Sequence, residues 1–342
     1  MALSKKQKDR LKFFIFFGLG LLLLWLSTKG IDFKNLLQYF KRVNYLPLAG
    51  VLLIGVGSHL FRALRWQMMI TPLGKKPGLG NTFMAVMIGY LVNLATPRMG
   101  EVAKCAILTK YEGIPADKLA GTMIAERTVD MLCLVLVALL TTVFEAQMVG
   151  DYLGQKIWQP VMTKLGSLSA GSVALAIAGV AAGIFAVVFL LKSLSKKPFG
   201  QKITNIIKGF WTGFTSIRNI KNFWGFIGYS LMVWVCYYLM VQVGFLAFQD
   251  TTHLGVGAGL SLLTLGTLGF IVSPGGIGAY QLIIKEALMN LYLVGEEPAL
   301  AFGWMSWGIQ TMILILLGFL SVLLLPVFNK SKAYEQAATD RQ

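Results

Sequence analysis

Charged residues are scarce in this chain. Asp, Glu, Lys and Arg make up 13% of its 342 residues, about half of their share in soluble domains. Apolar runs of 18 or more residues recur along the chain, and the mean hydropathy is +0.67. A soluble core would alternate apolar with polar positions, so these runs predict an all-α polytopic membrane protein. The same composition excludes a disordered chain and a cytosolic enzyme.

Cysteine and histidine are also few. Cys105, Cys133 and Cys236 are odd in number and far apart, so they predict neither a disulfide framework nor a metal-binding spacing. His59 and His253 are too few and too widely separated for a metal site. The sequence contains no zinc, haem or ATP-binding motif, and we therefore expect no cofactor and no ATP-driven activity.

Positive charge, in contrast, is in excess. The 31 Lys and Arg residues against 15 Asp and Glu residues give a formal net charge of +16. In a soluble protein this excess would suggest a nucleic-acid partner. Here the basic residues gather in a few loops, as membrane topology requires. We therefore expect no nucleic-acid partner. The most basic loop, residues 192–221, is predicted to be cytoplasmic, and counting spans from it places both termini in the cytoplasm of a cell (inner) membrane protein.

The apolar segments fall into two classes. Two shorter regions, 81–110 and 255–294, begin and end on the same side of the membrane when charges are counted. Each is therefore predicted to be a re-entrant helical hairpin, and the two enter from opposite faces; the alternative is ordinary pairs of spans with misplaced loops. Six longer segments are predicted to be full transmembrane helices, at about 11–27, 46–66, 119–144, 168–191, 223–248 and 299–327.

Two opposed hairpins broken by Pro and Gly predict an inverted repeat with a binding site near the middle of the membrane. The two halves show no clear sequence match, so the repeat is predicted from topology alone. Residues 1–328 then form a single membrane domain, and 329–342 form a short cytoplasmic tail.

Several charged residues lie inside predicted spans, where each costs at least about 2.5–3.5 kcal/mol. Glu126, Arg127 and Asp130 carry a net charge of −1, so a further cation is expected beside them, Arg98 first and Arg62 next. One interpretation is a salt-bridge lattice that only fixes helix packing. The other is a polar cavity whose arginines bind an anionic headgroup through planar two-point contacts. Arg65, near the inner end of its span, is expected to snorkel to lipid phosphates.

The segment from Ser273 to Gly278 reads Ser-Pro-Gly-Gly-Ile-Gly. Its backbone N–H groups could form a nest that cradles a phosphate at a helix start. A tight turn with close helix packing needs the same glycines, and the sequence does not distinguish these two interpretations.

Three motifs in this order resemble the flippase-like membrane domain of lysylphosphatidylglycerol synthases and their stand-alone relatives. The first runs from Asn93 through Pro97 and Arg98 to Gly100 and Glu101. The second is Glu126-Arg127-x2-Asp130, and the third is Pro274-Gly275-Gly276-Ile277-Gly278. The likeness covers about residues 10–328. The family often has a Glu shortly after the glycine motif, whereas this chain has Tyr280 and Gln281.

The resemblance implies a translocator that moves an anionic phospholipid, or a related lipid, between leaflets. No aminoacyltransferase domain follows residue 328, so we do not expect an enzyme. Its partners would be the lipid, a second copy of the chain or a lipid-synthesis enzyme. The alternatives are a secondary transporter of a soluble anion and a non-transporting scaffold for a lipid-modifying enzyme. The expected substrate-binding residues are Arg62, Asn93, Pro97, Arg98, Glu101, Glu126, Arg127, Asp130, Ser273, Pro274, Gly275, Gly276 and Gly278.

Overall fold

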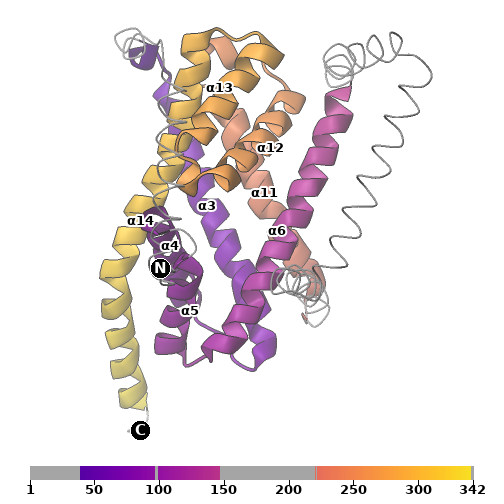
Figure 1. Ribbon diagram of the computed structural model, residues 1–342. Coiled ribbons are helices and arrows are strands. Elements are labelled where there is room, and N and C mark those ends of the chain that lie inside the picture. Colours follow the sequence, from indigo (N-terminus) through magenta and orange to yellow (C-terminus); the bar gives the residue numbers. More distant parts are fainter. Residues whose placement is uncertain (1–38, 97–98, 147–219, 221, 340–342) are drawn as a thin grey trace, which may run out of the picture.

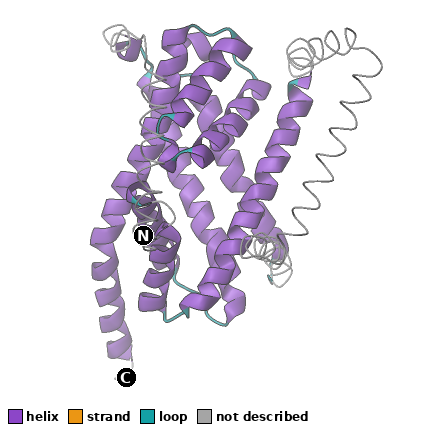
Figure 2. Cartoon of the chain, viewed as in Figure 1, coloured by secondary structure: helices purple, strands orange, loops and turns teal. Residues whose placement is uncertain are grey.

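The structure is a computed structural model that describes residues 39–96, 99–146, 220 and 222–339 (Figure 1). Every regular element of this part of the chain is a helix (Figure 2), which confirms the all-α prediction. The predicted spans at 11–27 and 168–191 lie outside the described residues. Four helices are long and apolar enough to cross a membrane and coincide with the other predicted spans: α3 (Tyr45–Ile70), α6 (Ala116–Phe144), α11 (Phe223–Phe245) and α14 (Glu296–Thr339).

Four shorter helices form two pairs. In each pair one helix has 17 residues and the other 14. At 1.5 Å per residue these are about 25 and 21 Å long, which is less than the roughly 30 Å of a bilayer core. The pair α4–α5 lies beside the lower half of α3 in Figure 1, and the pair α12–α13 lies beside its upper half. The four are α4 (Leu79–Ala95), α5 (Met99–Glu112), α12 (Val256–Val272) and α13 (Ala279–Tyr292).

The order of helices occurs twice along the chain. The first group, α3 to α6, and the second group, α11 to α14, each read long, short, short, long. α5 and α13 begin at residues 99 and 279, and α6 and α14 begin at 116 and 296, so equivalent positions there are 180 residues apart. The linker before the last helix has three residues in both groups. Its first residue has a left-handed backbone in each, with φ of 63° at Gly113 and 55° at Leu293.

Glycine allows the two helices of the first pair to approach closely. Gly89 of α4 and Gly100 of α5 face each other, and a Cβ on Gly100 would collide with the carbonyl oxygen of Gly89. The Asn93 side-chain oxygen accepts a hydrogen bond of 2.8 Å from the Gly100 N–H. At the other end of the pair, Glu112 accepts from Asn81. The two helices therefore run antiparallel as a hairpin.

The second pair is built in the same way and points toward the first. Gly266 of α12 lies against the ring of Tyr280 in α13. The turn between them, Pro274–Gly276, reaches the end of α4, where a Cβ on Gly275 would lie 3.4 Å from Leu94. The Trp307 indole N–H of α14 donates to the Gly275 carbonyl at 2.8 Å. The tips of the two pairs thus meet between the long helices.

The last helix differs from its prediction at its end. The expected span closes at residue 327, but α14 continues without interruption past Pro326 to Thr339. Residues 329–339 of the predicted tail are therefore helical. The prediction that residues 1–328 form a single membrane domain stays a prediction.

Candidate functional site

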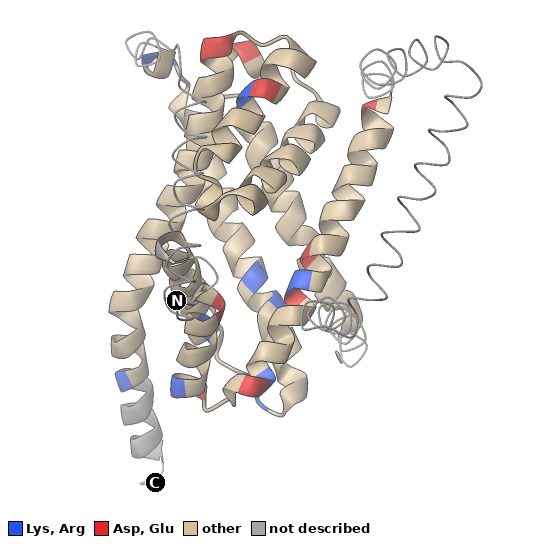
Figure 3. Ribbon diagram, viewed as in Figure 1, with Lys and Arg blue, Asp and Glu red and all other residues tan. Residues whose placement is uncertain are grey.

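Among the described residues, the charged ones gather at the two ends of the helices and in one place between them (Figure 3). That place is in the lower half of the structure, where α3, α5 and α6 meet. We call it the ion-pair cluster, and it consists of Arg62 and Arg65 from α3, Lys104 from α5, and Glu126 and Asp130 from α6.

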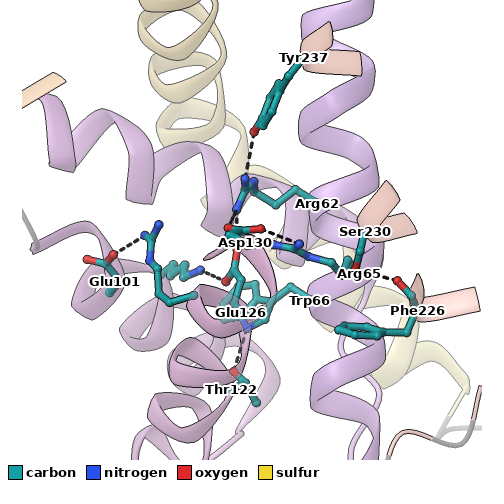
Figure 4. Close-up of polar contacts among 12 residues, drawn as sticks. Arg62, Arg65, Trp66, Glu101, Thr122, Glu126, Asp130, Phe226, Ser230 and Tyr237 are labelled. Carbon is teal, nitrogen blue, oxygen red and sulfur yellow. Dashed lines mark hydrogen bonds and ion pairs between the residues drawn. The ribbon is translucent and has the colours of Figure 1, made fainter. Parts of the chain in front are cut away.

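The helical spacing of these residues explains how they meet. Arg62 and Arg65 are three apart on α3, and Glu126 and Asp130 are four apart on α6, so each pair shares one helix face. Arg62 lies 3.0 Å from Glu126 and 2.8 Å from Asp130. Arg65 lies 2.7 Å from Asp130 and 3.4 Å from Glu126. Figure 4 shows the two arginines and the two carboxylates pointing toward one another.

Further contacts hold the ion-pair cluster from other helices. The Lys104 ammonium lies 2.6 Å from Glu126 and 4.5 Å from the centre of the Trp66 ring, which is close enough for a cation–π contact. Arg62 also donates to the Tyr237 hydroxyl of α11 at 2.9 Å. Four helices therefore converge on the cluster, and Glu126 is 2% exposed.

The structure confirms one charge prediction and corrects another. Arg62, the second of the two cations expected beside Glu126 and Asp130, pairs with both; the first, Arg98, lies outside the described residues. Arg65 does not snorkel, because its side chain is fully buried and paired with both carboxylates. The prediction was wrong because the span read from hydropathy closes at residue 66, whereas α3 continues to Ile70. Arg65 therefore lies more than one turn before the end of its helix.

The ion-pair cluster holds more positive than negative charge. Three cations face two carboxylates, which leaves one positive charge in excess among these five side chains. The Nε atoms of Arg62 and Arg65 are buried and have no hydrogen-bond partner within the described part of the chain. A buried excess charge is costly, and guanidinium N–H groups suit an oxyanion. Anion binding at this site stays a prediction.

A polar pocket opens beside the ion-pair cluster. We define it by Tyr90 and Asn93 of α4, Glu101 and Lys104 of α5, and Arg127 of α6. Arg127 points away from the ion-pair cluster and pairs with Glu101 at 2.5 Å, with 54% of its side chain exposed. Lys104 belongs to both sites, so it connects the buried charge with the pocket.

The predicted site residues in the second pair lie elsewhere, at its tip. Gly275, Gly276 and Gly278 have φ of 64°, 74° and 75°, which favours glycine. The Gly276 N–H donates to the Ser273 carbonyl at 3.0 Å, and the Ile277 N–H donates to that of Pro274 at 3.4 Å. The turn thus uses two of the N–H groups that a phosphate nest would need. Pro97 and Arg98 lie outside the described residues, and binding by any of these residues stays a prediction.

Sequence reasoning missed Lys104 and Tyr237. Lys104 follows Glu101 by three positions and so shares its helix face. That spacing was the available signal. Tyr237 comes from α11, 175 residues after Arg62, and no local pattern connects the two.

The profile of a known family matches nearly all of this chain. The family is described as the lysylphosphatidylglycerol synthase TM region, and the match covers residues 11–318. The chain belongs to this family. The resemblance seen in the three motifs is thereby confirmed.

Two curated proteins are similar to this chain. The UPF0104 membrane protein MJ1595 of Methanocaldococcus jannaschii is 34% identical over 90 residues, 25% of this chain and 26% of that protein. Glycosyltransferase AglD of Haloferax volcanii is 24% identical over 350 residues, 94% of this chain and 56% of that protein. The chain thus spans about half, or less, of the curated relatives that it matches. No solved structure matches it.

Membership fixes the broad character of the protein. It is a multi-pass membrane protein with four candidate spans in its described part. Its family is named for the membrane region of an enzyme that makes a lipid, which connects the chain with membrane lipids.

Proposed function

We propose that this protein is a translocase, and not an enzyme, that moves an anionic phospholipid or a related anionic lipid between the two leaflets. The headgroup would follow a polar pathway past the tips of two re-entrant hairpins, while the acyl chains stay in the bilayer. The observation that carries this proposal is the excess positive charge of the ion-pair cluster beside the polar pocket.

The short pairs support the re-entrant part of the proposal. Neither α4–α5 nor α12–α13 is long enough to cross the bilayer twice, and they lie at opposite ends of the long helices (Figure 1). Their tips meet at Leu94 and Gly275. Irregular backbone at membrane depth is tolerated only where protein or a water-filled cavity surrounds it. The repeated order of helices then forms an inverted repeat with its site between the halves.

Charge at the two ends supports an orientation. The lower end carries mainly basic residues, with Glu112 and Asp117 among them, and the opposite end carries mainly acidic ones, with Lys41, Arg42 and Lys285 among them. Because Lys and Arg are enriched in cytoplasmic loops, we place the polar pocket on the cytoplasmic side. The basic residues of the lower end are Lys75, Lys76, Lys110, Lys118 and Lys330; the acidic residues of the other end are Glu145, Asp250, Glu286, Glu296 and Glu297.

Arg127 is the residue that tests headgroup binding most cleanly. Its ion pair with Glu101 is partly exposed, with 54% of the Arg127 side chain and 27% of the Glu101 side chain accessible, and exposed pairs contribute only about 0–1 kcal/mol to stability. A phosphate-bearing headgroup in the polar pocket would lie beside this guanidinium. Arg127→Ala should therefore lower transport without lowering the folded yield.

The experiment uses proteoliposomes that contain acyl-labelled phosphatidylglycerol, with a membrane-impermeant quencher reporting its leaflet. We expect Arg127→Ala to lower the translocation rate at least about tenfold per folded protein. Lys118→Ala, an exposed cation on the same helix, should keep the parent rate. If Arg127→Ala moves the lipid at the parent rate, headgroup binding in the pocket is wrong. If the parent protein moves no lipid but does move inorganic phosphate, the result would contradict the proposed function and favour a transporter of a soluble anion.

A further inference from the structure

The second group of helices has polar side chains at the positions that correspond to the carboxylates of the ion-pair cluster. α6 and α14 are related by 180 residues, so Glu126 corresponds to Ser306 and Asp130 to Gln310. Polar residues thus occupy both pairs of positions, but those of the second group are uncharged.

The same correspondence extends to the neighbouring helices. Tyr280 and Gln281, in the first turn of α13, correspond to Gly100 and Glu101 of α5. Gln281 therefore takes the position of a residue that lines the polar pocket in the first group.

A cavity lies where the correspondence predicts it. It is lined by Tyr280, Ser306 and Gln310 and is otherwise apolar, with room for about one water molecule. Met240 of α11 lines it as well. α3 and α11 begin at residues 45 and 223, so Met240 corresponds to Arg62. Three of the five positions of the ion-pair cluster thus have counterparts that line this cavity, with a thioether in place of the Arg62 guanidinium.

Gln281, which follows the cavity residue Tyr280 in the first turn of α13, has an amide without a partner in the part of the chain that the structure describes. Its side chain is fully buried, and neither its oxygen nor its nitrogen has a hydrogen-bond partner among the described residues. The indole nitrogen of Trp304, which follows Gly303 where α14 packs on Gln281, is also buried and unpartnered. Buried polar groups nearly always have a partner, and in a membrane such groups mark functional sites. An amide and a hydroxyl each offer both donors and acceptors, as alcohol groups of a ligand require.

We propose that Tyr280, Gln281, Ser306 and Gln310 form an uncharged second subsite, which binds the hydroxyl groups of the lipid headgroup. The inference rests on the proposed function. It assigns the headgroup phosphate to the cationic side chains of the first group of helices, and the uncharged part of the headgroup to the second group. The substrate class is then an anionic phosphodiester lipid whose headgroup carries free hydroxyls, such as a glycerol or a sugar. A headgroup with no hydroxyl leaves the buried amide of Gln281 unpaired and is transported more slowly.

The test compares two acyl-labelled lipids in the same proteoliposomes: phosphatidylglycerol and phosphatidylpropanol. Both carry one phosphodiester charge and three headgroup carbons, but only the first has headgroup hydroxyls. The parent protein should move phosphatidylglycerol at least about tenfold faster. Gln281→Leu and Gln310→Leu should lower that rate toward the rate of phosphatidylpropanol and leave the latter unchanged. Asn290→Leu, an exposed amide on α13, is the control and should keep the preference.

Folding is measured in parallel by thermal unfolding in detergent. Gln281→Leu removes an amide that has no partner and keeps a similar volume, so the unfolding temperature should not fall. Equal rates for the two lipids in the parent protein would overturn the subsite and leave the proposed function standing. Variants that slow both lipids equally would overturn it as well, since the residues would then be structural. If neither lipid moves, the proposed function itself fails.

Discussion

The balance of charge in the ion-pair cluster makes a prediction about stability. Glu126→Gln leaves Arg62, Arg65 and Lys104 facing a single carboxylate, so two positive charges are in excess. Lys104→Met instead leaves two arginines facing two carboxylates, which is a balanced set. We therefore expect the loss of the carboxylate to destabilise the protein far more than the loss of the lysine.

The contacts give approximate magnitudes. Removing one partner of a buried ion pair costs about 3–5 kcal/mol, because the other charge is left uncompensated. Glu126 is 2% exposed and contacts three cations, so Glu126→Gln should fall in this range. Lys104→Met removes one charge-assisted hydrogen bond of 2.6 Å but relieves the excess charge. Its cost should be about 1.5 kcal/mol.

The measurement is the free energy of unfolding in mixed micelles with increasing dodecyl sulfate. Lys118→Met, at an exposed position of α6, controls for the loss of a lysine. An anionic phospholipid added to the micelles should stabilise the parent protein by binding its folded state, and this increment should disappear in Lys104→Met. Equal destabilisation by Lys104→Met and Glu126→Gln would refute the charge count and favour a purely structural lattice.

Three further outcomes are expected. Arg65→Leu should lower the free energy of unfolding by about 3–5 kcal/mol, measured in the same micelles; a loss under 1 kcal/mol would mean that the side chain snorkels after all. Gly100→Ala should lower the unfolding temperature, because its Cβ would collide with the facing helix, whereas Gly121→Ala, with nothing within 4 Å of its Cβ, should not. In intact cells, cysteines introduced at Lys118 and Thr252 should react with an impermeant thiol reagent only at Thr252, and labelling of both from outside would contradict the proposed orientation.

Sequence and tertiary structure contributed differently to the helices. Hydropathy predicted α3, α6, α11 and α14, because a helix that crosses the lipid needs a long apolar run whichever helices pack against it. Hydropathy together with charge counting also predicted the two short pairs near their observed bounds, because the charges around each pair indicate which side of the membrane its ends face.

The site shows a similar division. The scarcity of charge in spans was enough to select Arg62, Glu126 and Asp130, because a buried charge needs a partner. Which cations complete the set depended on packing. Arg65 lies in the cluster because α3 extends to Ile70, and Lys104 enters it because α5 folds back against α6.

The sequence predicted a repeat from topology, but the residue-by-residue correspondence between the two groups came only from the structure. Glu126 and Ser306 have no chemical likeness, so no comparison of the two halves as sequences relates them. Helix lengths, linker lengths and the shared left-handed linker residue do relate them, because backbone geometry is retained where side chains differ. Charge and hydropathy depend on each residue separately and can be read along the chain, whereas a site formed by side chains from several helices exists only once those helices have packed.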